Sequence, residues 1–352
     1  MNMDNSPLIT CVIPTYRRPR MVERAIRSVL AQTFTRLRVF VTDNSSGDET
    51  ADLIRSIQEK DSRVAYHCQP SNIGMIANFA YGMAQVETPF FSLLSDDDVL
   101  LPKFYELAYS EFIKYPKAFF VATKVLCVTE KGRLIEEPLS SWDRFGIFEP
   151  PTGAHRVAAI SHPTITGILF RSEIIDRTNS LIEPNFHAAD YEIILDVAVN
   201  HPVVTVDEPG ALFIQHQGVR SLPQDPLSVP NHFMDLIRRI DEDCRYPSEI
   251  KAKACHKYKI YVSGYLRGMI IQSCTEGEFK KAKIGLGILR EIDDKSRLYA
   301  MLNFIYLICY KIPGIRLLIK YSLSKYRRIN KMLLERKMNY IETEYLSLLN
   351  RN

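Results

Sequence analysis

Three adjacent carboxylates, Asp96, Asp97 and Asp98, follow an apolar segment that ends at Leu94, with only Ser95 between them. Two unit charges about 4 Å apart repel by about 1 kcal/mol in water and by about 4 kcal/mol at an effective dielectric constant of about 20. A hard divalent cation would remove this repulsion, because it prefers oxygen ligands, and it would also neutralise a diphosphate leaving group. The triplet therefore predicts a Mn²⁺ or Mg²⁺ site. The alternative is a solvated acidic turn, which the apolar residues on either side disfavour.

The segments around the triplet alternate between expected strands and expected helices. Short apolar, β-branched segments predict strands, and apolar residues every three or four positions predict helices. The expected strands are residues 8–13, 38–42, 64–67, 90–94, 119–128, 166–170 and 203–206, and the expected helices are residues 21–31, 75–83, 102–115 and one that opens at Asp190. Ser46 and Glu49 have the spacing of a capping box before a further helix. This alternation predicts an α/β fold with a mostly parallel sheet.

Chemically specialised residues follow the first four expected strands. They are Pro14, Thr15 and Tyr16 after the first strand, Asp43 after the second, Asn72 and Gly74 beyond the third, and the acidic triplet after the fourth. In open α/β sheets, ligands bind at the carboxyl ends of the strands. These residues are therefore candidates for one binding site.

The bulk composition is that of a soluble globular protein. The chain has 352 residues, of which 46% are hydrophobic and 24% are charged, and its net charge of +4 is too small to indicate a nucleic-acid partner. Its seven cysteines include no Cys-x-x-Cys pair, which argues against a disulfide framework and a zinc site. The start of the chain has no signal-peptide pattern, and no apolar segment reaches the roughly 18 residues of a membrane span. We expect a cytoplasmic location.

Residues 223–352 differ in character from the α/β part. We expect a catalytic domain over residues 1–222, with halves of about 1–100 and 101–222, and a basic helical region over residues 223–352. From Lys295 to Leu334 there is no acidic residue, and basic residues alternate with aromatic and aliphatic ones. This pattern is typical of helices on an anionic membrane surface, which would make the protein peripheral at the inner face of the plasma membrane. The alternative is a helical bundle whose basic face is solvated.

The order and spacing of these motifs resemble the family 2 glycosyltransferases of the GT-A fold over roughly residues 7–220. The motifs are Pro14 to Pro19, Asp43 to Ser46, Asn72 to Gly74, and Ser95 to Asp98 with Pro102. A dinucleotide oxidoreductase would instead have Gly-x-Gly-x-x-Gly after the first strand, and that sequence is absent. The resemblance implies inverting, metal-dependent transfer of one sugar from a UDP- or dTDP-sugar to a hydroxyl of a glycan or polyprenyl-linked glycan.

The resemblance also implies roles for individual residues. Nucleotide contacts fall on Pro14, Thr15, Tyr16, Arg18, Asp43, Asn72, Gly74 and Asp96. Metal ligands fall on Asp97, on Asp98 as a second ligand or polar neighbour, and on His216, and a phosphate contact falls on Arg220. By their types alone, Asp43 is equally an Asx-turn acceptor, Arg18 a solvated helix start, and His216 a surface histidine.

The implied general base is Asp190, with Glu192 as the backup. An inverting transfer needs a base that takes the proton from the acceptor hydroxyl. By its type, Asp190 could instead cap the helix that it opens. The family often has two acids at this point, and here Ala189 replaces the first. A catalytically inactive glycan-binding or scaffold protein with the same fold is therefore the alternative function.

Overall fold

The computed structural model describes residues 6–176, 189–216, 227–293, 296–312, 314–325, 341 and 343–349. The chain divides into two compact units. The first consists of Met1–Gln217 together with Asn339–Asn352, and the second of Gly218–Met338.

The first unit contains all the strands among the described residues. They are β1 Ile9–Thr15, β2 Leu37–Asp43, β3 Val64–Cys68, β4 Phe90–Leu93, β5 Val99–Leu100, β6 Phe120–Thr129, β7 Leu134–Glu136, β8 Gly146–Phe148, β9 Ile168–Arg171 and β10 Val203–Gln215. Its helices are α1 Pro19–Leu30, α2 Thr50–Gln58, α3 Met75–Ala84, α4 Phe104–Lys114, α5 Thr152–Ala159, α7 Ala189–Asn200 and α13 Thr343–Leu349.

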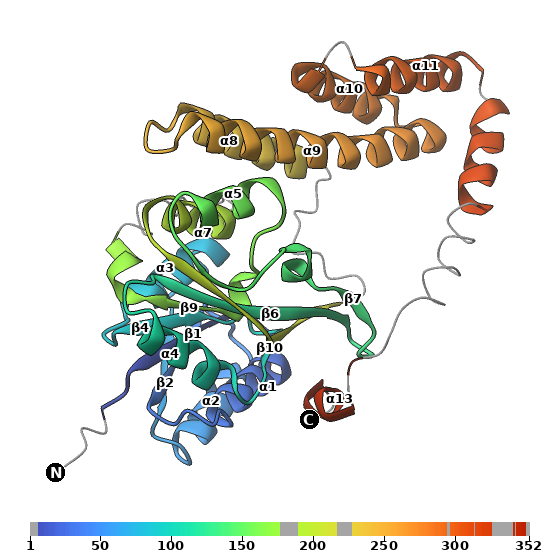
Figure 1. Cartoon of the computed structure of the whole chain (residues 1–352). Helices are drawn as coiled ribbons and strands as arrows, with labels where there is room; N and C mark the ends of the chain where they lie inside the picture. Colours follow the sequence, from blue (N-terminus) through green and yellow to red (C-terminus); the bar gives the residue numbers. More distant parts are fainter. Residues whose placement is uncertain are drawn as a thin grey trace. The chain divides into compact units, whose positions relative to one another are not determined.

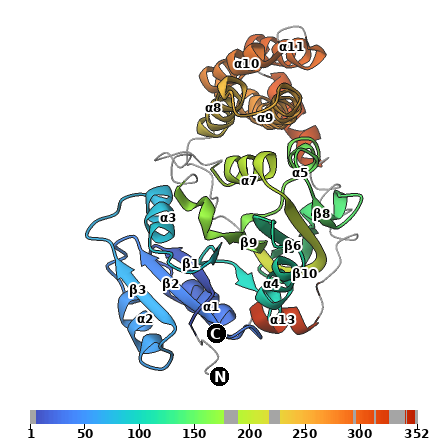
Figure 2. The same ribbon diagram turned by 60° about the vertical axis from the view of Figure 1, so that its left-hand side comes forward.

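The strands form one mixed sheet between two layers of helices. The order is β3-β2-β1-β4-β9-β6-β10-β5, with β7 on β6 and β8 on β10. Strands β1 to β4 are parallel, β9 runs antiparallel to β4 and β6, and β6 and β10 are parallel. Helices α1, α2 and α4 cover one face, and α3, α5 and α7 cover the other (Figures 1 and 2). Both faces are covered, so β1 is apolar at successive positions and buried throughout.

The alternation of strands and helices confirms the predicted α/β fold, but three local predictions were wrong. The helix after β2 has no Ser46–Glu49 capping box, since Ser46 bonds Asp43 and the helix begins at Thr50, whose N–H bonds Asp48. Strand β10 continues to Gln215, well beyond the expected end. Residues 130–163, where neither a strand nor a helix was expected, contain β7, β8 and α5.

The second unit is helical. It contains α8 Ser228–Glu242, α9 Ser248–Glu276, α10 Phe279–Asp293, α11 Arg297–Lys311 and a helix over residues 314–325. Its core includes Leu266, Ile270, Leu286 and Leu302. Helix α9 ends at Glu276, and the next residue, Gly277, has a φ of +84°, the left-handed conformation that glycine adopts without strain. Among the helices that the structure describes, none is long and apolar enough to cross a membrane.

The C-terminal segment packs on the first unit, although the sequence prediction grouped it with the helical region. Ile341 and Leu349 join a buried cluster with residues of β5, β6 and β10. The N–H of Ile341 also donates to the carbonyl of Gly132. Burial of these apolar side chains against the sheet edge explains why the chain returns to the first unit.

Candidate active site

The sheet register aligns three predicted site residues at the carboxyl ends of β2, β1 and β4. Thr15 lies opposite Asp43, and β1 pairs with β4 such that Val12 lies opposite Leu93. Three residues further on, the Thr15 hydroxyl donates to Asp96 Oδ2 at 2.8 Å. Parallel pairing therefore produces this row, since strands in register end at the same edge.

The acidic triplet connects two distant parts of the sheet. It leaves β4 and enters β5, which pairs with β10 at the other side of β9 and β6. The turn is tight, because the N–H of Asp98 donates to the carbonyl of Ser95 at 3.1 Å. The three carboxylates consequently meet different surroundings.

Arg18 provides the positive charge nearest to Asp96 and Asp97. Its guanidinium donates to Asp96 Oδ1 at 3.1 Å and to Asp97 Oδ2 at 3.0 Å. Burial opposes the charged form of Arg18, yet the two carboxylates raise the pKa of the guanidinium above its ordinary value. Burial also raises the pKa of Asp96, although Arg18 and Thr15 oppose that shift. Arg18 therefore offsets part of the repulsion within the triplet.

Asp98 points into the protein. Its side chain accepts from the Thr166 hydroxyl at 2.7 Å and from the N–H of Ile214 at 3.0 Å, and the residue is 1% exposed. Burial, followed by repulsion from Asp97, raises the pKa of Asp98 to about 8. Both carboxylate oxygens thus have partners inside the protein, which favours the role of polar neighbour over that of metal ligand.

His216 faces Asp97 from the end of β10. Its Nε2 lies 3.7 Å from Asp97 Oδ2, and its Nδ1 lies 2.8 Å from Glu130 Oε1. Among the residues that the structure describes, the buried Nε2 has no hydrogen-bond partner. Parallel pairing of β6 and β10 places Thr129 opposite Gln215, so Glu130 and His216 leave the sheet side by side.

Glu130 and Arg24 belong to this site, and the sequence analysis missed both. Glu130 directly follows a strand, so the rule applied to the first four strands would have selected it as well. Arg24 donates to the backbone carbonyl of Asp97 at 2.8 Å. Burial lowers the pKa of Arg24 more than the nearby carboxylates raise it. No sequence motif marks Arg24, since it lies within an amphipathic helix.

Asp43 organises the loop after β2. Its Oδ1 accepts from the N–H of Ser46 at 2.9 Å and from the Ser46 hydroxyl, and its Oδ2 accepts from the Tyr66 hydroxyl at 2.7 Å. The carboxylate, which is 1% exposed, raises the pKa of Tyr66, with burial as the larger cause. Asp43 therefore bonds its own loop, although the N–H from which it accepts lies three residues on and not two, as it would in an Asx turn.

Hydrogen bonds of two asparagine side chains connect the loops after β2 and β3, which are predicted to bind the nucleotide. Asn44 donates from Nδ2 to Asn72 Oδ1 at 3.0 Å, and the N–H of Gly74 donates to the same oxygen at 3.0 Å. Gly74, which precedes α3, has a φ of +89°. Glycine adopts this conformation at little energetic cost, whereas a residue with a Cβ would be strained there. Tyr16 is exposed beside this loop system, after Pro14 and Thr15 have ended β1.

The predicted bases differ in accessibility. Asp190 is half-buried in the first turn of α7, and its Oδ1 accepts from the N–H of Tyr191 at 2.8 Å. Glu192 is 2% exposed. Within the described part of the chain, no hydrogen bond or ion pair links Asp190 to the triplet. Arg220 lies outside the described residues.

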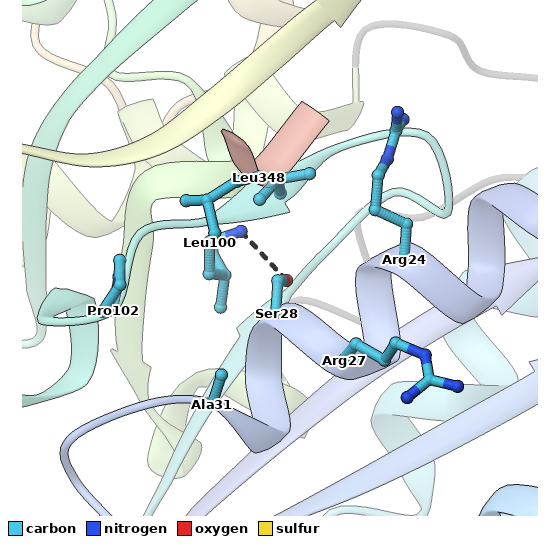
Figure 3. Close-up of a pocket in the computed structure, with 8 residues that line it drawn as sticks. Arg24, Arg27, Ser28, Ala31, Leu100, Pro102 and Leu348 are labelled. Carbon is cyan, nitrogen blue, oxygen red and sulfur yellow. Dashed lines mark hydrogen bonds between the residues drawn. The ribbon is translucent and has the colours of Figure 1, made fainter. Parts of the chain in front are cut away.

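A small cavity lies beside the triplet but is not a donor site. It measures about 40 Å³ and lies between α1, β5 and Leu348, as Figure 3 shows. This volume suits about one or two water molecules. Of the site residues named above, only Arg24 lines the cavity. In its wall, the hydroxyl oxygen of Ser28 accepts a hydrogen bond from the N–H of Leu100 at 3.1 Å. The cavity is a packing gap between α1 and the C-terminal helix.

Comparisons with known proteins bear on the family and the fold of this chain. The model of the family "Glycosyl transferase family 2" matches residues 10–175. A GalNAc(5)-diNAcBac-PP-undecaprenol beta-1,3-glucosyltransferase of Campylobacter jejuni is 33% identical over 96 residues, which are 27% of this chain and 31% of that protein. The chain thus aligns with about a third of the length of that curated relative.

Two solved structures show the same fold. S. aureus TarS residues 1–349, in complex with UDP-GlcNAc, has a TM-score of 0.62 at 14% identity and covers 90% of this chain and 91% of its own. The mannosyltransferase PcManGT from Pyrobaculum calidifontis, in complex with GDP-Man and Mn²⁺, has a TM-score of 0.53 at 13% identity and covers 91% and 87%. With the motifs, the mixed sheet and the family match in agreement, residues 10–175 are identified as a family 2 glycosyltransferase region, and the chain has the GT-A fold.

Proposed function

We propose that this protein transfers one sugar from a nucleotide diphosphate sugar to a hydroxyl of a glycan or lipid-linked glycan, with inversion at the anomeric carbon. The observation that carries the proposal is the pairing of Asp97 with His216 beside the Thr15–Asp96 row. These groups lie at or just beyond the ends of β1, β4 and β10, and β10 is separated from β4 in the sheet by β9 and β6, so the turn through the acidic triplet brings Asp97 to His216.

A divalent cation fits the donor atoms that Asp97 and His216 present. The described residues include no group of three or more His, Cys, Asp and Glu side chains that could hold a metal ion. Ions such as Mg²⁺ need few protein ligands, because substrate phosphates and water supply the others. The buried Nε2 of His216, which has no hydrogen-bond partner among the described residues, faces the Asp97 carboxylate. When bound, Mn²⁺ or Mg²⁺ would neutralise charge on the diphosphate.

Asp98 then has a supporting role. Since its oxygens bond Thr166 and the N–H of Ile214, it fixes the turn against β10 and so holds Asp97 opposite His216. We assign Asp97, rather than Asp98, as the carboxylate ligand.

We assign the nucleotide to the loops after β1, β2 and β3. Tyr16 and Asn72 lie in these loops, and Asp96, which accepts from the Thr15 hydroxyl, is the proposed ribose contact. Asp43 would reach a base N–H only by exchanging a present partner. The UDP-sugar in the TarS structure supports a uracil donor here, with thymine as the close alternative. Arg18 and Arg220 are the proposed phosphate contacts.

Asp190 is the proposed general base. The half-buried Asp190 can exchange a proton with an acceptor more readily than Glu192, which is almost fully buried. Asp190→Asn is expected to lower the rate of sugar transfer by at least about a hundredfold, while the affinity for donor and Mn²⁺ stays within a factor of about two. Transfer that survives in Asp190→Asn but is lost in Glu192→Gln would assign the base to Glu192 instead.

A lipid-linked acceptor is supported by the name of the C. jejuni relative, whose substrate is an undecaprenyl diphosphate glycan. Such an acceptor would bring the enzyme to the inner face of the plasma membrane.

The decisive experiment compares two aspartate variants on a panel of nucleotide sugars. Nucleotide release from UDP- and dTDP-sugars is measured with Mn²⁺ for the wild type and for Asp97→Asn, with the exposed Asp52→Asn as the matched control. We expect release only in the wild type and the control. If no donor changes the melting temperature or turns over, the protein is a binding or scaffold protein instead.

A further inference from the structure

Helix α11 is apolar on two opposite sides, and only one of them is covered. Its inner side, which includes Leu302 and Cys309, packs into the core of the second unit. Its outer side has Met301, Phe304 and Leu307, spaced by three residues, and all three are exposed, Phe304 to 62%. A helix that is hydrophobic all round is normally buried all round. The outer stripe of α11 therefore needs an explanation.

The helix over residues 314–325 repeats this arrangement. Ile315 and Ile319 contact the core, whereas Leu317, Leu318 and Tyr321 face outward and are 67–73% exposed. Scattered exposed apolar residues are ordinary, but exposed apolar residues at helical spacing along one side of a helix mark an interaction site. The outer residues of the two helices are called here the apolar strip: Met301, Phe304, Leu307, Leu317, Leu318 and Tyr321.

The charge beside the apolar strip identifies its partner. The segment from Lys295 to Leu334 has nine basic and no acidic residues, and the whole chain has a net charge of +4, so the other 312 residues have a net charge of −5. Lys311, Lys320 and Lys325 are exposed next to the strip. Two such cationic faces repel each other, which disfavours a second copy of this chain as the partner. An anionic bilayer offers both apolar depth and opposite charge.

We propose that the apolar strip and its flanking lysines bind the surface of an anionic lipid bilayer, with the apolar side chains at the level of the head groups. This inference rests on the proposed function in one respect: membrane binding would serve to bring the enzyme to a lipid-linked acceptor. Binding itself requires neither donor nor turnover. Tyr321 suits this depth, because its ring is apolar and its hydroxyl is polar.

Vesicle sedimentation of the full chain tests the proposal. We expect the wild type to sediment with phosphatidylcholine vesicles that contain about one-third phosphatidylglycerol at about 0.1 M salt, and to release at about 0.5 M salt. Phe304→Ser and Leu318→Ser are each expected to weaken partitioning by roughly tenfold. The matched control is Ile113→Ser, which changes a residue that is 67% exposed in α4 of the first unit, and it should bind like the wild type.

The lysines are tested separately. Lys320→Ala and Lys325→Ala are each expected to weaken partitioning about fivefold, whereas Lys60→Ala, in the first unit, should have no effect. Equal sedimentation with pure phosphatidylcholine, equal losses in the controls, or a dimer in size-exclusion chromatography that Phe304→Ser dissociates would overturn the proposal. Vesicle binding without turnover of any donor would refute the proposed function alone, and turnover without vesicle binding would refute only this inference.

Discussion

Replacement of the buried Asp98 tests whether its carboxylate is structural. Its pKa of about 8 lies about four units above the unfolded value of about 3.9, mainly because of burial. The folded protein therefore keeps this proton over a range in which the unfolded chain has lost it. The contribution of Asp98 to stability is thus greatest below about pH 4 and is lost as the pH rises to about 8. Four units correspond to an upper limit of about 5 kcal/mol.

Asp98→Asn removes this pH-dependent cost and keeps the shape of the side chain. The bonds from Thr166 and the Ile214 N–H to the carboxylate offset part of the cost, so we expect a net gain of about 2–3 kcal/mol in unfolding free energy at about pH 8 without metal. Near pH 4 the gain should vanish or change sign. Donor turnover should stay within about fivefold of the wild type, whereas Asp97→Asn should lose at least about a hundredfold.

The assay is urea unfolding of the wild type and Asp98→Asn at several pH values in the presence of EDTA. The difference between the two proteins isolates Asp98, because all other titrating groups are common to both. If Asp98→Asn is less stable than the wild type at about pH 8, the carboxylate is ionised and stabilising in the folded protein, and the reasoning from burial fails.

Three further changes probe the neighbourhood of the site. Glu130→Gln should weaken Mn²⁺ binding about tenfold without loss of fold, because the carboxylate that orients His216 is lost; unchanged affinity in an electron paramagnetic resonance titration of free Mn²⁺ would exclude this role. Arg18→Met should bind Mn²⁺ roughly three- to tenfold more tightly without nucleotide, since the guanidinium no longer competes for the carboxylates; equal or weaker binding in the same titration would show that it does not compete. Gly132→Ala should lower the unfolding free energy by about 1–3 kcal/mol, because φ is +72° and the added Cβ would overlap the Leu346 side chain. Calorimetry should show partial rescue by Leu346→Ala, and a neutral Gly132→Ala would mean that the C-terminal segment does not pack there.

The sequence determined the features that depend on neighbouring residues. The alternation of apolar segments fixed the first four strands and their helices, since burial of both sheet faces selects apolar runs and amphipathic helices. The residues after those strands could be named as a site because parallel strands end at one edge. The adjacency of Asp96, Asp97 and Asp98 needed no tertiary information.

The tertiary structure decided which of these groups face one another. Asp98 bonds the N–H of Ile214, 116 positions away, only because β5 pairs with β10, and no local pattern encodes that pairing. The contact between His216 and Glu130 likewise depends on the register of β10 with β6. Local periodicity specifies which side of an element is buried, but the partner across the sheet is set by strand order. The difference between Asp97, which faces His216, and Asp98, which points into the protein, therefore depends on the tertiary structure and not on the local sequence.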